Sequence, residues 1–161
     1  MNEKSESKLH IVTVVAVIHD NDGRVLVLKR RGDEVVYPDM YTFPGGKIEG
    51  FESVEETLRR EVLEETGMQL KLGKILLKDK TIMRPDGQVS QSFSYLCEVE
   101  DTENVHISGD FTDYKWIRLN DLVDIPHVGI EEELEKAEKI LQSGIDLNVL
   151  KTKSVKADLK K

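Results

Sequence analysis

Three glutamates, Glu61, Glu64 and Glu65, stand close together in a segment whose pattern predicts the last turns of a helix. Residues spaced i, i+3 and i+4 lie on one helix face, so the three carboxylates share an arc of roughly 100°. Like charges at this spacing destabilise a helix by on the order of 0.2–0.5 kcal/mol per pair, and the negative end of the helix dipole repels them further. A hard divalent cation with oxygen ligands, Mg²⁺ above all, would offset this repulsion.

A plainer interpretation of the same glutamates stays open at this point, because a run of charges is most often a solvated helix face. The residues around the glutamates are therefore needed to distinguish a metal site from a solvated surface.

The segment that carries the glutamates has the pattern of a helix with one buried side. Ser53 is a predicted N-cap, and Glu56, three residues later, completes a capping box. Leu58 and Val62 belong to a buried stripe, and Gly67 is a predicted helix stop. Because the apolar stripe adjoins the acidic arc, we expect the glutamates to lie at the rim of a cleft.

The residues before this helix predict strands and turns. Ile11 to Ile18 is rich in β-branched residues and predicts a strand; Val25 to Lys29 predicts the returning strand of a hairpin, across the turn signal Asp20-Asn21-Asp22-Gly23. The segment Phe43-Pro44-Gly45-Gly46 follows. Its paired glycines indicate backbone that bends sharply or comes close to another group.

The residues after the acidic helix predict more strands and a second helix. Strands are expected over 73–83, 89–100 and 116–119. Apolar residues at helical spacing predict the second helix, namely Ile130, Leu134, Ala137 and Leu141. We interpret its acidic run, Glu131-Glu132-Glu133, as a solvated face. Together these elements predict one α+β (α/β) domain over residues 9–148, between a flexible N-terminus (1–8) and a basic, loosely ordered tail (149–161).

Composition limits the classes of function. The chain has 161 residues, of which 39% are hydrophobic, and this suits one globular domain. Its net charge of −8 disfavours binding to polymeric nucleic acid or to anionic membranes. Cys97 is the single cysteine, so no intrachain disulfide forms, and its apolar surroundings predict a buried, inert thiol. With no membrane span and no signal-like apolar core, we expect a cytoplasmic protein.

The acidic helix and the glycines before it match a family pattern in full. The Nudix box is Gly-x5-Glu-x7-Arg-Glu-U-x-Glu-Glu-x-Gly-U, where U is a bulky aliphatic residue. Here Gly46 is followed at these spacings by Glu52 and Arg60, and the remaining positions run from Glu61 to Met68. All nine specified positions are filled within one 23-residue window, so the chain closely resembles the Nudix hydrolase family.

The resemblance implies a fold and a metal site. It implies a mixed β-sheet sandwich flanked by helices, and a loop–helix–loop that holds Mg²⁺, with Mn²⁺ as an alternative. Carried over by position, Glu61, Glu64 and Glu65 are the implied ligands, joined by the backbone carbonyl of Gly45. Asp110, in a later loop, is our first choice for a further acidic ligand, ahead of Asp113, although glutamate is commoner at this place in the family.

The resemblance also implies roles in catalysis. Arg60 orients the Glu61 carboxylate by a charge-assisted hydrogen bond, and Glu52 supports the site near the start of the helix. A carboxylate at the rim accepts the proton of the attacking water, and Glu61 or Glu64 is our choice for this base. Arg30, Arg31 and Tyr41 are the predicted substrate-binding residues, with a surface role for the arginines left open.

The activity implied is hydrolysis of a phosphoanhydride in a nucleoside diphosphate linked to another moiety. Our first choice of substrate is a nucleoside triphosphate, normal or oxidised, cleaved to the monophosphate and pyrophosphate. ADP-ribose or a nucleotide sugar is the alternative, because Pro85 lies 17 residues past Met68, as in some ADP-ribose enzymes of the family, although it also suits an ordinary turn. A non-catalytic nucleotide-binding regulatory domain is the rival from another class. The sequence leaves open whether two copies of the chain form a homodimer.

Overall fold

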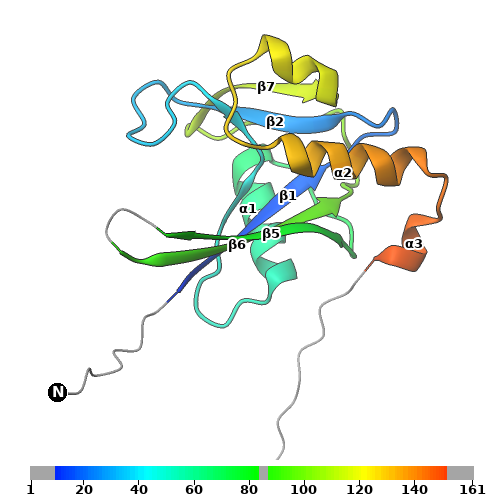
Figure 1. Ribbon diagram of the computed structural model, residues 1–161, viewed down its shortest axis with the longest axis horizontal. Coiled ribbons are helices and arrows are strands. Elements are labelled where there is room, and N and C mark those ends of the chain that lie inside the picture. Colours follow the sequence, from blue (N-terminus) through cyan, green and yellow to red (C-terminus); the bar gives the residue numbers. More distant parts are fainter. Residues whose placement is uncertain (1–9, 84–86, 152–161) are drawn as a thin grey trace, which may run out of the picture.

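Strand β1 (Ile11–Ile18) lies at the centre of the fold, because both of its faces are covered. Its side chains alternate between the two faces of the sheet. Val14, Ala16 and Ile18 pack on the side of helix α1 (Val54–Thr66), whereas Val17 packs on the side of helix α2 (Glu131–Gln142). The computed structural model, which describes residues 10–83 and 87–151, thus has a helix on either side of its sheets (Figure 1).

Two sheets lie between the helices. The four-stranded sheet has the order β4-β1-β6-β5, in which β1 runs parallel to β6 and antiparallel to β4. The three-stranded sheet has the order β3-β2-β7. The further strands are β2 (Val25–Arg30), β3 (Tyr41–Thr42), β4 (Gly45–Lys47), β5 (Ile75–Met83), β6 (Val89–Cys97) and β7 (Phe111–Ile117). These mixed sheets flanked by helices confirm the predicted fold class.

The predicted hairpin of the first two strands is wrong. The turn is present, since the Asp20 carboxylate accepts the N–H groups of Asp22 and Arg24 at 2.9 and 2.8 Å. However, β1 and β2 belong to different sheets and share only an isolated bridge between His19 and Val25. Both edges of β1 are already occupied, by β4 and β6, so the chain leaves its sheet after the turn.

Other boundaries differ by a few residues. The expected strands 73–83 and 89–100 are Ile75–Met83 and Val89–Cys97, and they pair as an antiparallel hairpin. The strand expected at 116–119 is the longer β7, which ends at Ile117, and the 3₁₀ helix η1 (Leu119–Asp124) follows it. A short helix, α3 (Leu147–Leu150), comes after α2.

Helix α1 begins and ends as predicted. The Ser53 hydroxyl accepts the N–H of Glu56 at 3.1 Å, and the Glu56 carboxylate accepts the N–H of Ser53 at 3.1 Å, which completes the capping box. Gly67 has a φ of 72°, in the left-handed region, and its N–H donates to the carbonyl of Leu63. Hydrogen bonds therefore fix both ends of α1, including the last turns, which carry the three glutamates.

Some expectations fall on residues that the structure leaves undescribed. The N-terminal segment 1–8, Pro85 and residues 152–161 of the basic tail lie outside the described part of the chain. Cys97, which is described, is buried, and burial raises the pKa of its thiol to about 12, as expected of an inert cysteine. None of the helices within 10–83 and 87–151 is long and apolar enough to cross a membrane.

Replacing Ser53 by alanine removes the side chain that caps α1. Loss of such a cap costs about 1 kcal/mol, so we expect the melting temperature to fall by roughly 2–4 °C. Ser53→Asp is the matched control, because aspartate accepts the same N–H and keeps the melting temperature close to that of the natural chain. Equal melting of the alanine variant and the natural chain would show that the box contributes nothing to stability.

Candidate functional site

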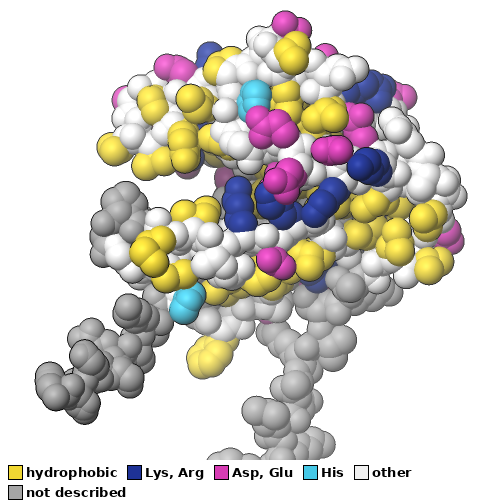
Figure 2. All heavy atoms as spheres, viewed as in Figure 1, with side chains coloured by type: hydrophobic (Ala, Val, Ile, Leu, Met, Phe, Trp, Pro, Cys, Tyr) yellow, Lys and Arg dark blue, Asp and Glu magenta, His cyan; other side chains and the backbone are white. Residues whose placement is uncertain are grey.

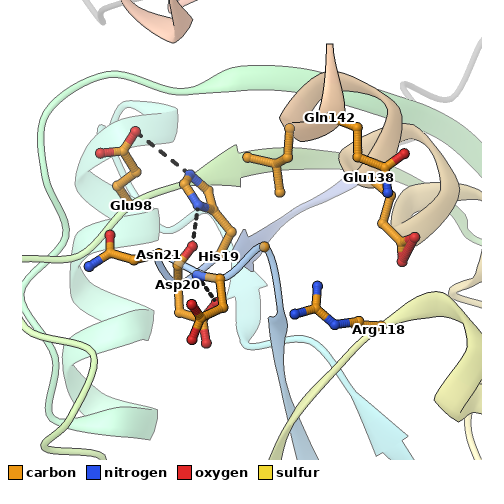
Figure 3. A pocket seen from close by; sticks show the side chains of 10 residues that line it. His19, Asp20, Asn21, Glu98, Arg118, Glu138 and Gln142 are labelled. Atoms are coloured by element: carbon orange, nitrogen blue, oxygen red, sulfur yellow. Dashed lines mark hydrogen bonds and ion pairs between the residues drawn. The ribbon is translucent and has the colours of Figure 1, made fainter. Parts of the chain in front are cut away.

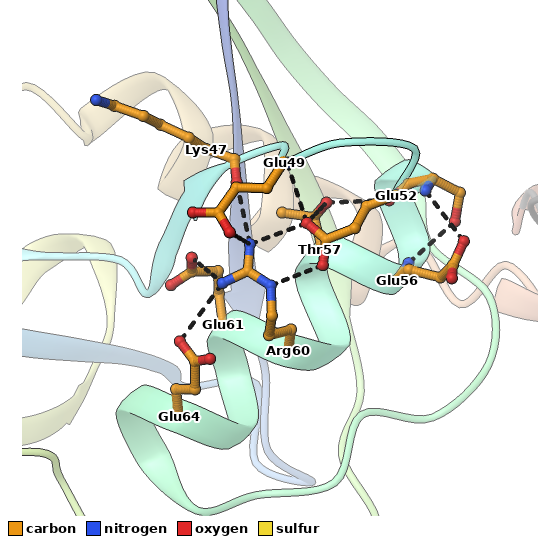
Figure 4. A network of polar contacts seen from close by, with 9 residues as sticks. Lys47, Glu49, Glu52, Glu56, Thr57, Arg60, Glu61 and Glu64 are labelled. Carbon is orange, nitrogen blue, oxygen red and sulfur yellow. Dashed lines mark hydrogen bonds and ion pairs between the residues drawn. The ribbon is translucent and has the colours of Figure 1, made fainter.

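Arg60 lies in the middle of the carboxylate cluster on α1 (Figure 4). Its Nε and Nη2 donate to the two oxygens of Glu52 at 2.7 and 3.0 Å, and its Nη1 donates to Glu61 Oε1 at 2.8 Å. The hydrogen bonds from Arg60 lower the pKa of Glu52 to about 2, and those carboxylates in turn raise the pKa of Arg60. The bond expected between Arg60 and Glu61 is therefore present.

The same network fastens the loop before α1 to the helix. Arg60 Nη2 also donates to the carbonyl of Lys47 at 3.1 Å, at the end of β4. Glu52 accepts the Thr57 hydroxyl and the N–H of Glu49, each at 3.1 Å. The segment that joins β4 to α1 is thus held against the helix by side chains from both.

The three box glutamates occupy different environments. The side chain of Glu64 is 59% exposed and meets Arg60 only at 3.5 Å, whereas that of Glu61 is 15% exposed. Glu65 is buried, and burial raises the pKa of Glu61 as well, against the opposing effect of Arg60. The end of the helix therefore presents one exposed carboxylate and two that are largely shielded from solvent.

Of the three glutamates, Glu65 is the one whose burial changes its pKa strongly. Both of its carboxylate oxygens lie 3.3 Å from the N–H of Gly45, on the adjacent strand β4. Burial raises the pKa of Glu65 to about 8; the Gly45 contact opposes this shift, and the nearby charges of Glu61 and Asp110 add to it. A buried carboxylate with one backbone donor, beside other carboxylates, lacks a compensating positive charge.

The paired glycines are needed because two groups come close to them. A Cβ on Gly46 would lie 2.3 Å from Glu61 Oε1, and a Cβ on Gly45 would lie 2.3 Å from the carbonyl oxygen of Val14. A side chain at either position would collide with these atoms. The absence of a side chain at Gly46 lets Glu61 reach the backbone of β4, as the close approach expected of this pair requires.

Asp110 is brought to the cluster by a loop that docks on the end of α1. The N–H of Ser108 donates to the carbonyl of Glu65 at 3.0 Å, and Arg31 Nη1 donates to the carbonyl of Gly109 at 3.3 Å. Asp113 is engaged elsewhere, because its carboxylate accepts the hydroxyl of Tyr41. Of the two later acids, Asp110 is the one whose charge acts on Glu65.

The carboxylates and the strand backbone beside them offer oxygen ligands that suit a hard divalent cation. In the present arrangement, however, these side chains do not surround a common point. Within the described residues, no three His, Cys, Asp or Glu side chains are arranged around a common point. Arg60 holds one oxygen of Glu61, and uncompensated carboxylates repel each other. Carboxylate and backbone carbonyl oxygens are the ligands that Mg²⁺ prefers, and the Glu64 carboxylate is exposed to solvent beside Arg60.

A cavity of about 400 Å³ begins beside the glycine pair. Thr42 and Phe43 line it and directly precede Pro44-Gly45, and Val15, which also lines it, pairs with Gly45 between β1 and β4. Figure 2 shows the molecule hollowed on this side, between the loop before β3 and the β5–β6 hairpin. The segment from Thr42 to Gly46 therefore connects the cavity with the acidic cluster.

The predicted substrate-binding residues have different positions. Arg30 lines the cavity, and its Nε donates to the carbonyl of Val36 at 2.9 Å. Arg31 does not line the cavity but pairs with Asp33 at 2.8 Å. Tyr41 is buried, and its hydroxyl is bound to Asp113. Of the three, only the position of Arg30 favours contact with a ligand in the cavity; the role of the other two stays a prediction.

A second cavity of about 420 Å³ lies at the far end of α2, between the turn after β1 and the last residues of that helix (Figure 3). Its polar groups bind one another. His19 lies 3.6 Å from Glu98, and Glu138 accepts the N–H of Leu119 at 2.6 Å. None of the box glutamates lines either cavity, but the first one is lined by Thr42 and Phe43, next to the glycine pair, so we assign the ligand to the first one.

The sequence interpretation of Glu133 is wrong. We expected a solvated residue, but Glu133 is 3% exposed and lines the first cavity. The signal was available in the spacing, since Glu133 lies three residues after Ile130 and four before Ala137, both on the buried stripe of α2. Glu131 and Glu132 do lie at the surface, where they pair with His127 and Lys78.

Comparisons with known proteins identify a matching domain family. Residues 9–137 match the NUDIX domain family. The nucleoside triphosphatase NudI of Escherichia coli O139:H28 (strain E24377A) is 36% identical over 122 residues, which cover 69% of this chain and 84% of NudI.

Solved structures have the same fold. The MutT protein of Methanosarcina mazei Go1 is 21% identical with a TM-score of 0.65, over 88% of this chain and all of that one. The NUDIX domain of Shewanella oneidensis NrtR, in complex with ADP ribose, is 23% identical with a TM-score of 0.67, over 87% of this chain and 94% of that domain.

Replacing Gly46 by alanine places a Cβ against Glu61 Oε1 and forces this carboxylate away from β4. Displacing a group that supports metal ligands typically costs ten- to a hundred-fold in affinity, so we expect Mn²⁺ affinity in calorimetry to fall by roughly this factor. Ser53→Ala is the control, because it weakens the same helix at its other end and should leave the affinity unchanged. Unaltered Mn²⁺ binding by the Gly46 variant would contradict the role given to this close approach.

Proposed function

The chain belongs to the NUDIX domain family and is a pyrophosphohydrolase, and on that premise we propose that it hydrolyses nucleoside triphosphates to the monophosphate and pyrophosphate with the help of Mg²⁺. One observation carries this proposal. The three glutamates at the end of α1 lie close to the Gly45-Gly46 backbone and the Asp110 loop, and the segment from Thr42 to Gly46 connects them with a cavity of about 400 Å³. A cavity of this size falls in the usual range for small-molecule sites, which is roughly 300–1,000 Å³.

The proposed ligands of the metal ion are the carboxylates of Glu61, Glu64, Glu65 and Asp110, together with the carbonyl of Gly45. Mn²⁺ is the expected substitute, since it accepts the same oxygen ligands. When bound, the metal neutralises phosphate charge and lowers the pKa of a bound water. Arg60 keeps Glu61 oriented for this role, and Glu52 keeps Arg60 oriented in turn.

The reaction requires a group that accepts a proton from water. The water oxygen attacks phosphorus, the anhydride bond between the α- and β-phosphates breaks, and pyrophosphate leaves. Between the two glutamates chosen for this step, Glu64 is the better candidate in the structure. Glu61 Oε1 already accepts a short bond from Arg60, whereas Glu64 is exposed and held only at 3.5 Å.

A nucleoside triphosphate is the first-choice substrate because the NudI relative is a nucleoside triphosphatase and shares 36% of its residues over the aligned region. ADP-ribose and nucleotide sugars are the alternative class, and a regulatory domain that binds nucleotides without turnover is the rival. The rival is disfavoured by the intact box, in which all the carboxylates are kept.

We expect the purified chain with Mg²⁺ to convert nucleoside triphosphates to monophosphate and pyrophosphate, with products separated by chromatography. The panel also contains ADP-ribose, a nucleotide sugar and a dinucleoside polyphosphate. Glu64→Gln removes the proposed proton acceptor and should lower kcat by about 10²–10⁴-fold. Glu135→Gln is the matched control, because Glu135 is exposed on α2 and pairs with Lys139 at the surface.

The outcomes separate the hypotheses. Turnover of ADP-ribose in place of triphosphates would move the substrate to the alternative class. Tight nucleotide binding without turnover on any compound would favour the regulatory domain. No uptake of Mg²⁺ or Mn²⁺ in calorimetry, with or without nucleotide, would falsify the proposal as a whole.

A further inference from the structure

Glu133 carries a buried carboxylate oxygen that has no partner. Within the described residues, its Oε2 is the one buried side-chain oxygen or nitrogen without a hydrogen bond. The residue is 3% exposed and lines the cavity that the segment from Thr42 to Gly46 connects with the acidic cluster. An unpaired buried acceptor destabilises a protein, and departures of this kind are expected at functional or strained sites.

Two lysines near Glu133 donate to other groups. Lys78 Nζ pairs with Glu132 at 2.7 Å, and Lys136 Nζ donates to the carbonyl of Leu77 at 3.0 Å. Figure 2 shows basic and acidic side chains gathered on this side of the molecule, next to the hollow. Because these lysines are engaged, the Glu133 oxygen remains available to a donor that enters the cavity.

The walls of the cavity suit a flat aromatic ring. Apolar side chains from four segments line it, namely Val15, Val36, Phe43, Ile82, Val128 and Ile130. Ser92 and Ser94 of β6 add two buried hydroxyl groups. Since Thr42 to Gly46 links this cavity to the acidic cluster, a nucleotide whose phosphates meet the glutamates would place its base here.

We propose that Glu133 is a specificity-determining residue that selects guanine among the bases; this inference rests on the proposed function. An ionised carboxylate only accepts hydrogen bonds. Guanine presents two adjacent donors, its N1–H and its 2-amino group, which match the two oxygens of a carboxylate. Adenine and cytosine present one amino group beside an acceptor nitrogen, and thymine and uracil present one N–H between two carbonyl oxygens, which a carboxylate repels.

The test compares kcat/KM for dGTP, dITP, dATP and dTTP in the natural chain and in Glu133→Gln. The natural chain should prefer dGTP to dITP, which lacks the 2-amino group, and should prefer dGTP to dTTP by a larger factor. A bidentate contact discriminates between bases by roughly ten- to a hundred-fold, so Glu133→Gln should lose the preference for dGTP by that factor. Glu135→Gln is the matched control, because Glu135 is an exposed glutamate of the same helix that pairs with Lys139, and its change should leave the preference intact.

Two further measurements separate this inference from a structural role and from the proposed function. Because Glu133→Gln removes a buried unpaired charge, its melting temperature without ligand should rise; a fall would indicate a structural residue and overturn the inference. Calorimetry with dGMP and dTMP reports base selection without turnover. Preferential dGMP binding that the variant loses supports the inference even if no triphosphate is hydrolysed, whereas unchanged base preference in Glu133→Gln overturns it while leaving the proposed function intact.

Discussion

The guanidinium of Arg60 makes the rest of the site possible. Carboxylates at one helix end repel each other, and in a partly buried place this repulsion is stronger than in water. Arg60 binds Glu52 and Glu61 at once and also reaches the carbonyl of Lys47. Its planar fork has enough donors to satisfy all three with fixed geometry, which a lysine could not do. The loop from β4 and the helix α1 are thereby held in one arrangement, with the negative charge already concentrated.

This arrangement divides three similar residues among three environments. Glu61 is oriented by Arg60, Glu65 is buried against the N–H of Gly45, and Glu64 is left at the surface. The helix period alone gives them a common face, but the neighbouring strand and the loop before Asp110 make them different. In the proposed metal site, a cation would meet Glu61 and Glu65, which are held by their neighbours, and the exposed Glu64.

Features that depend on nearby residues were predicted correctly from the sequence, whereas the pairing of distant strands was not. The capping box at Ser53 and the stop at Gly67 depend on neighbours within a few residues, so the bounds of α1 could be predicted from the sequence. The turn at Asp20 was also recognised, but a turn signal does not tell which strands pair, and β1 pairs with β6, far along the chain. The burial of Glu133 was missed because its acidic neighbours outweighed its place on the apolar stripe.

Helices α1 and α2 pack on opposite faces of β1, and this separation has an evolutionary consequence. The glutamates proposed for bond cleavage belong to one layer, and Glu133, which lines the cavity, belongs to the other. Mutations that reshape α2 can therefore accumulate without disturbing the acidic helix. After gene duplication, substitutions confined to the α2 layer can change which ligand binds. The residues of the acidic helix α1 then stay the same.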